Sequence, residues 1–217
     1  MIDPDIHAMF EYHRARHAEA EFETDLEALA ARLGLVVRSG DSSHLGPDGT
    51  VNLRRGLGAA ERRSHLAHEL SHHLSREGQP SYEQVIRHRH TSAPDLPGHL
   101  EALADHGGDL LTMPDAVVRA VVKVCGVSAA AVWTLHQMCE VPLAEALRRL
   151  VHVDPDCRRG GFISIGGVVQ SAAVWRYRLP FWVGDRVPEM NSPNVSRCGV
   201  PGRRAAEIGL ILAGAVT

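Results

Sequence analysis

The segment from Ser64 to Leu74 reads SHLAHELSHHL and contains the pattern H-E-x-x-H at positions 68 to 72. In an α-helix, residues four apart point the same way, so the imidazoles of His68 and His72 can bind one metal ion from one helix face. Glu69 then lies beside the metal, where a general base belongs. The segment therefore predicts a helix that carries a catalytic metal site.

The same segment also has an apolar stripe. Four apolar residues recur at helical spacing and predict a buried face: Leu66, Ala67, Leu70 and Leu74. The alternative is a solvated histidine-rich helix, because the chain holds 14 histidines in 217 residues. His65 shares the helical face of positions 68 and 72, but it lies one turn too far away to complete the same tetrahedral site. We expect it behind the ligands rather than among them.

A catalytic site of this kind needs a third protein ligand and leaves the fourth position to water. Glu101 is the best downstream candidate, because it lies on a second predicted helix together with Asp105. Asp105 is four residues further on and can accept a hydrogen bond from the second nitrogen of a ligand imidazole, which fixes the ring tautomer. The alternative for this pair is an ordinary acidic helix face.

The segment from Glu101 to Pro114, EALADHGGDLLTMP, resembles the second motif of the ImmA/IrrE family of bacterial metallopeptidases. In that family a helix containing L-A-H-E is followed by a Glu, then Ala and Asp or Asn, two small residues and a Leu-Leu-Met-Pro end. The match runs without a gap, and Thr112 replaces the second Leu of the family pattern. Ser64 is a second departure, because the family usually has a large apolar residue there. The resemblance covers roughly residues 25 to 150.

The resemblance implies a zincin-like metallo-endopeptidase in which His68, His72 and Glu101 bind the metal and Glu69 is the catalytic base. Zinc is the expected ion, and the same ligands accept manganese. The implied substrate is a helix-turn-helix repressor of the XRE type, whose cleavage releases stress-response or mobile-element genes. The alternative is a DNA-binding transcriptional regulator with a structural or inactive metal site.

The composition of the chain argues against binding to nucleic acid or to membranes. The formal net charge is −3, which offers no bulk attraction to nucleic acid or to an anionic membrane. The four cysteines are scattered without a C-x-x-C pair, as expected for reduced thiols. The start of the chain does not resemble a signal peptide, and no apolar run is long enough to span a bilayer. We therefore expect a cytoplasmic protein that is not bound to membranes.

The pattern of helices and strands predicts an α+β fold with three parts. Residues 1–114 form the zincin-like domain, 115–153 a helix-turn-helix-like helical block, and 154–217 a β-rich C-terminal segment. The helical block is expected to be a packing module. The alternative, contact with DNA through Arg148 and Arg149, is disfavoured because few basic residues are available.

Two further expectations concern the substrate. The strand before the motif helix, formed by Val51, Asn52, Leu53 and Arg54, is expected to lie at the edge of the sheet and to pair with an extended peptide. The segment from Gly78 to Pro97 is expected to be an exposed connection with a solvated histidine-rich run at 87–90. The alternative is that Tyr82 or one of these histidines stabilises the oxyanion.

The last segment is expected to form strands around 160–169 and 173–177, joined by glycine turns. Aromatic residues concentrate in the second strand and directly after it: Trp175, Tyr177, Phe181 and Trp182. We expect them to form a small β core, and a partner-binding face is the alternative.

Overall fold

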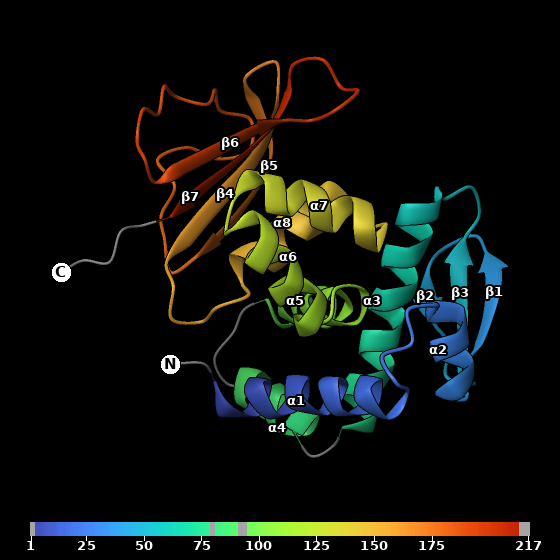
Figure 1. Ribbon diagram of the computed structural model, residues 1–217. Helices are drawn as coiled ribbons and strands as arrows, with labels where there is room; N and C mark the ends of the chain where they lie inside the picture. The colour runs from blue at the N-terminus through green and yellow to red at the C-terminus, as the bar shows by residue number, and fades with distance from the viewer. Residues whose placement is uncertain (1–2, 79–80, 91–94, 213–217) are drawn as a thin grey trace. The chain divides into compact units, whose positions relative to one another are not determined.

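The computed structural model describes residues 3–78, 81–90 and 95–212, which fold as a mixed α+β protein with eight helices and two small sheets (Figure 1). The chain divides into two compact units, Met1–Pro114 and Asp115–Thr217. Below they are called the N-terminal and C-terminal units. In the described part of the chain, no helix combines the length and the apolar character needed to cross a membrane.

The N-terminal unit contains five helices and three strands in its described residues: α1 (Pro4–Glu19), α2 (Leu26–Arg32), β1 (Val36–Gly40), β2 (His44–Leu45), β3 (Thr50–Arg54), α3 (Ala59–Glu77), α4 (Ser81–His90) and α5 (Leu96–Thr112). The C-terminal unit contains α6 (Asp115–Cys125), α7 (Ala129–Cys139), α8 (Leu143–Val151), β4 (Arg159–Ile165), β5 (Val168–Trp175), β6 (Val195–Gly199) and β7 (Ala206–Leu212).

The sheet of the N-terminal unit has the strand order β1-β3-β2, with β1 parallel and β2 antiparallel to β3. A turn at 46–49 joins β2 to β3, and Asp48 holds it by accepting a hydrogen bond from the backbone of Thr50 (3.1 Å). The edge position expected for residues 51–54 is therefore wrong. Their strand is central because two short partners, one on each side, take up its backbone hydrogen-bonding groups. The edge strand on the antiparallel side is β2.

The core of the N-terminal unit lies between α2, α3, α5 and the sheet. The predicted apolar stripe of α3 is buried there with Val51 and Leu53, and all six residues are at most 2% exposed. Burying this stripe fixes the rotation of α3 about its axis. The adjacent face of the helix, which carries the two motif histidines, is consequently left at the border of the core.

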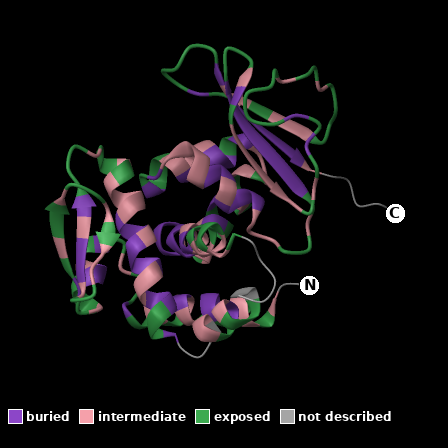
Figure 2. Ribbon diagram, turned by 180° about the vertical axis from the view of Figure 1, so that it is seen from behind, coloured by how far each residue is buried: buried purple, intermediate pink, exposed green. Residues whose placement is uncertain are grey.

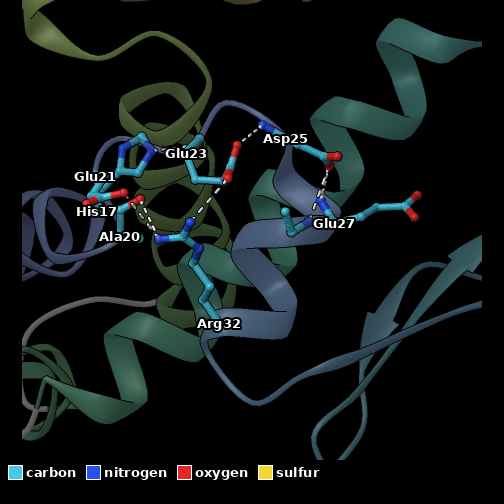
Figure 3. A network of polar contacts seen from close by, with 8 residues as sticks. His17, Ala20, Glu21, Glu23, Asp25, Glu27 and Arg32 are labelled. Atoms are coloured by element: carbon cyan, nitrogen blue, oxygen red, sulfur yellow. Dashed lines mark hydrogen bonds and ion pairs between the residues drawn. The ribbon is translucent and has the colours of Figure 1, made fainter.

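The link between α1 and α2 is held by a polar network (Figure 3). The Arg32 guanidinium donates to the carbonyl of Ala20 (3.3 Å) and lies 3.7 Å from the Glu23 carboxylate. Asp25 caps α2 by accepting from the N–H groups of Glu27 and Ala28. These contacts hold a link in which two non-glycine residues, at 21 and 22, have positive φ.

The segment from Gly78 to Pro97 is not simply an exposed connection, because most of its middle is α4, which packs against α1. Residues 79–80 and 91–94 of this segment lie outside the described residues. Tyr82 packs against an apolar cluster formed by Met9, Phe10 and Leu110, with Leu103 beside it. This packing stabilises a helix that the polar composition of the segment concealed.

The C-terminal unit is built on an antiparallel sheet with the strand order β5-β4-β7-β6. A tight turn at Gly166 and Gly167, both with positive φ, joins β4 to β5 as the glycine-rich sequence predicted. The helices α7 and α8 pack on this sheet, whose strands β4 and β7 are almost wholly buried (Figure 2). The expected boundary at residue 153 is therefore wrong, because the helical block and the strands share one core.

The four aromatic residues singled out from the sequence, at 175, 177, 181 and 182, divide between core and surface. The ring of Phe181 is buried and contacts Phe162 edge to face at 5.3 Å, and Tyr177 packs against the same cluster. Trp182, in contrast, is 50% exposed. The core interpretation thus holds for part of the set, and Trp182 belongs to the surface.

Arg149 does not project toward solvent as the DNA-contact alternative required. It is 2% exposed, and its guanidinium donates to the carboxylate of Asp115 at the start of α6. Because this charge is buried and paired inside the unit, Arg149 cannot contact a phosphate without unfolding its surroundings.

Candidate metal centre

The helix α3 positions the motif. Its N-terminus is closed by Glu61, whose carboxylate accepts a hydrogen bond from the backbone N–H of Gly58 (3.1 Å). From there the helix runs without interruption to Glu77, so His68 and His72 lie one turn apart on the same face. Their rings meet edge to face with centroids 4.7 Å apart. The predicted helical context of the motif is therefore present.

The helix α5 brings the third candidate ligand alongside. Asp95 caps it by accepting from the N–H of Gly98 (3.1 Å), and Glu101 follows on the turn after. A Cβ on Gly108 would lie 3.2 Å from backbone atoms of Ala67 and His68, so this glycine lets α5 approach the backbone of α3 at the motif. The closeness of the two helices sets the distance between the ligands.

The three side chains converge within hydrogen-bonding distance of one another. The Nε2 atoms of His68 and His72 are 3.1 Å apart. Glu101 places Oε2 3.1 Å from Nε2 of His68 and Oε1 3.5 Å from Nε2 of His72. In a tetrahedral zinc site with bonds near 2.05 Å, neighbouring ligand atoms are about 3.3 Å apart. The triangle therefore fits a single tetrahedral ion, and the donor set suits zinc.

Asp105 lies behind His68, as its spacing from Glu101 predicted. Its carboxylate is 2.9 Å from Nδ1 of His68 and raises the pKa of that imidazole. In the neutral ring this contact places the proton on Nδ1, which leaves the Nε2 lone pair facing the other two candidate ligands. The carboxylate and imidazole together form the arrangement that commonly orients a metal-binding histidine.

Glu69 is buried next to this triangle and is 6% exposed. Burial raises the pKa of its carboxyl group, while the neighbouring His68 and the backbone N–H of Leu45 act in the opposite direction. Leu45 belongs to β2, so the edge of the sheet reaches the candidate base. A carboxylate with a raised pKa beside an open metal position can accept a proton and return it, as a general base requires.

Other residues nominated from the sequence are not part of the cluster. The three ligand atoms that lie together belong to His68, His72 and Glu101 alone among the described residues. His65 stays outside, near Arg54, and burial lowers the pKa of its imidazole. Tyr82 packs with Leu103 and Leu110, on the side of α5 away from Glu101. The oxyanion role considered for Tyr82 therefore has no geometric support.

The strand β2 is the feature that sequence reasoning missed. It comprises two residues, His44 and Leu45, and the side chain of His44 lies 3.2 Å from that of Asn52 on β3. Two residues are too few to show the alternation by which a strand is recognised. The available signal was the turn at 46–49, which implies a strand on its N-terminal side as well as the predicted one after it.

Further along α3 from the two motif histidines lies a buried polar group. His13 of α1 is fully buried, and its Nε2 lies 3.2 Å from the hydroxyl of Ser75 on α3. Its Nδ1 and the hydroxyl of Ser71 have no hydrogen-bond partner among the described residues. A Cβ on Gly107 would lie 2.1 Å from that hydroxyl, so this glycine is needed for the junction of α1, α3 and α5.

This buried histidine predicts a pH dependence of stability. Burial lowers the pKa of His13 to about 4, so between pH 6.5 and 4 the unfolded chain binds a proton that the folded chain refuses. The free energy of unfolding is therefore highest above pH 6.5 and decreases as the pH falls from 6.5 toward 4. Protonation of His13 in the unfolded chain alone lowers it by about 2 kcal/mol between pH 7 and pH 5. Urea unfolding with a chelator present should show that His13→Gln loses this part of the slope. An identical slope in both proteins would contradict the assignment.

Comparison with known proteins gives a fold relationship. No protein-family model and no curated protein sequence matches the chain. Among solved structures, it is similar to a Mycobacterium tuberculosis transcriptional regulator, with a TM-score of 0.58 and 13% sequence identity, over 94% of this chain and 75% of that one. At this identity the similarity shows a shared fold and carries no information on activity.

Proposed function

We propose that the N-terminal unit is a metal-dependent endopeptidase of the ImmA/IrrE type. The observation that carries the proposal is the triangle of His68, His72 and Glu101, with the buried Glu69 next to it. Three protein ligands leave a fourth coordination position for water, which distinguishes a catalytic site from a closed structural one. The Asp105 contact adds the hydrogen bond that orients a ligand imidazole.

A divalent ion held by these three residues would act as a Lewis acid and lower the pKa of water to about 7. Glu69 takes the proton from the attacking water and passes it to the leaving amine. Burial raises the pKa of the Glu69 carboxyl group, which makes its carboxylate a stronger proton acceptor than an exposed one. Zinc is the expected ion, and manganese is the alternative that the same ligands accept.

The proposed substrate is an XRE-type repressor, and β2 is the strand proposed to bind it. A peptide binds by strand addition only where an edge offers free backbone groups, and Val51 to Arg54 lie in the middle of the sheet. The backbone N–H of Leu45 on β2 donates to Glu69, so a peptide that pairs with β2 at this residue would replace that contact. A peptide paired there would pass next to the candidate base.

The test is incubation of the protein with an XRE-type repressor from the same organism, with and without a chelator, followed by detection of cleavage products. Glu69→Gln is expected to retain stoichiometric zinc and to lose cleavage by about 100-fold or more, because it removes the base and spares the ligands. Glu83→Gln is the matched control: this carboxylate on α4 is half-exposed, pairs with Arg87 and lies outside the candidate site. Cleavage that continues unchanged in Glu69→Gln, or in chelator, would reject the enzymatic proposal.

The second candidate is a DNA-binding regulator; the structural neighbour, which shares the fold, is named a transcriptional regulator. The burial of Arg149 and the net charge of −3 count against it. Titration of duplex DNA at several salt concentrations tests it, since phosphate contacts make affinity fall steeply with salt. Binding at low salt that weakens as the salt concentration rises would favour the regulator. No binding at any salt concentration would exclude the regulator and favour the peptidase.

A further inference from the structure

The C-terminal unit contains a hollow next to its sheet that the proposed peptidase does not use. It has a volume of about 420 Å³ and is lined by one residue of β5 and seven from the loop that follows: Val174, Tyr177, Arg178, Leu179, Pro180, Phe181, Trp182 and Asp185. A volume of this size accommodates a small organic molecule. All of its lining belongs to one unit.

The loop that forms the hollow is anchored to the strands. The backbone of Val169 on β5 exchanges hydrogen bonds with Gly184 and Asp185, both 2.9 Å. The carboxylate of Asp185 in turn accepts a hydrogen bond from the backbone N–H of Trp182 (2.7 Å). These bonds hold the loop that lines the hollow in place without a ligand. Binding a ligand therefore costs less conformational entropy.

The floor of the hollow is fixed by close packing. A Cβ on Gly160 of β4 would lie 2.7 Å from the Tyr177 ring and 2.9 Å from Leu179, so the glycine lets both side chains settle on the strand. Phe181 is anchored from below by its edge-to-face contact with Phe162. The apolar side of the hollow is thus a rigid surface that includes two aromatic rings.

Two exposed side chains of the lining, those of Trp182 and Arg178, can contact a ligand in the hollow. Trp182 is 50% exposed, which leaves much of a large indole surface available for stacking. Arg178 is exposed, and its guanidinium has no hydrogen bond or ion pair with the described residues. The carboxylate of Asp185, the acidic residue of the lining, accepts a hydrogen bond from the backbone N–H of Trp182. An unpaired cation next to aromatic surface suits a flat anion.

We propose that this hollow binds a small planar aromatic anion, with Trp182 and Tyr177 contacting the ring system and Arg178 pairing with its carboxylate. The guanidinium matches a carboxylate in a bidentate geometry that a neutral amide cannot reproduce. The proposal is independent of the peptidase function, because no residue of the N-terminal unit takes part in it.

The experiment uses the full chain with naphthalene-2-carboxylate and its neutral isostere naphthalene-2-carboxamide, titrated by calorimetry. The carboxylate is expected to bind at least about 10-fold more tightly than the carboxamide, since charge-assisted hydrogen bonds are roughly twice as strong as neutral ones. Arg178→Gln should remove this preference and leave carboxamide binding unchanged. Trp182→Ala should weaken both ligands.

Arg203→Gln, an exposed arginine between β6 and β7, is the matched control and should bind both ligands as the original chain does. Thermal unfolding of each variant shows whether the unit remains folded, and exposed positions such as 178 and 182 should leave the midpoint nearly unchanged. Equal affinity for the two probes, no binding of either, or an unaltered preference in Arg178→Gln would overturn the proposal.

Discussion

Replacing Glu101 with alanine is expected to reduce the affinity of the protein for Zn²⁺ by at least about 100-fold, since even groups that only support a ligand are worth about 10- to 100-fold. The physical reason is the triangle: the Glu101 carboxylate lies 3.1 Å and 3.5 Å from the two imidazole nitrogens. Without it, only the two neutral imidazoles of His68 and His72 remain as candidate ligands. Competition with a chromophoric chelator at neutral pH measures the change directly.

Glu83→Ala is the control for that measurement, because it removes a half-exposed glutamate from another helix of the same unit. Asp105→Asn provides a graded comparison, since it weakens the contact with His68 and keeps all three candidate ligands. Its expected loss is smaller, about 10-fold. Should Glu101→Ala bind zinc as tightly as the original chain, Glu101 is not a ligand and the proposed open catalytic site is incorrect.

The candidate site could be predicted from the sequence because its residues are spaced four apart, as on one face of a helix. A residue and its neighbour four positions on share a face in any helix, so the pairing of His68 with His72 and of Glu101 with Asp105 needs no tertiary information. The convergence of the two helices does need it. Here the two-glycine segment was the available signal, because Gly108 lies against the α3 backbone at the motif.

The position of β3 could not be derived in the same way. Its burial pattern is compatible with both a central and an edge strand, and the deciding partner, β2, has only two residues. The helix α4 was missed for a related reason: its surface is polar, and its stability comes from packing on α1. Both elements are defined by neighbours distant in the chain rather than by local sequence.

The boundary expected at residue 153 failed because a change of composition was taken for a change of domain. The helices of the C-terminal unit have apolar faces that need a partner, and the sheet supplies it: Leu147 on α8 packs so closely that a Cβ on Gly161 of β4 would lie 2.5 Å from it. A helical block of 115–153 alone would expose this surface. The same helix carries Arg149, whose burial follows from that packing.

Removing the Asp115 carboxylate is therefore expected to be one of the most damaging single changes in the C-terminal unit. Asp115→Ala removes a carboxylate that pairs with the 2% exposed guanidinium of Arg149, and removing one partner of a buried ion pair costs about 3–5 kcal/mol of unfolding free energy. The pair joins the start of α6 to the end of α8, so its loss should loosen the packing of α6, α7 and α8 against one another. Urea unfolding monitored by far-ultraviolet circular dichroism measures the change.

A double-mutant cycle separates the pair from the burial of the charge. Arg149→Met removes the buried cation and keeps an unbranched apolar side chain, so combining it with Asp115→Ala should recover most of the lost stability. Asp156→Ala, an exposed carboxylate in the loop before β4, is the control and should change stability by less than about 0.5 kcal/mol. If Asp115→Ala costs no more than this control, Arg149 can reach solvent or another partner. Its side chain would then also be able to reach a DNA phosphate.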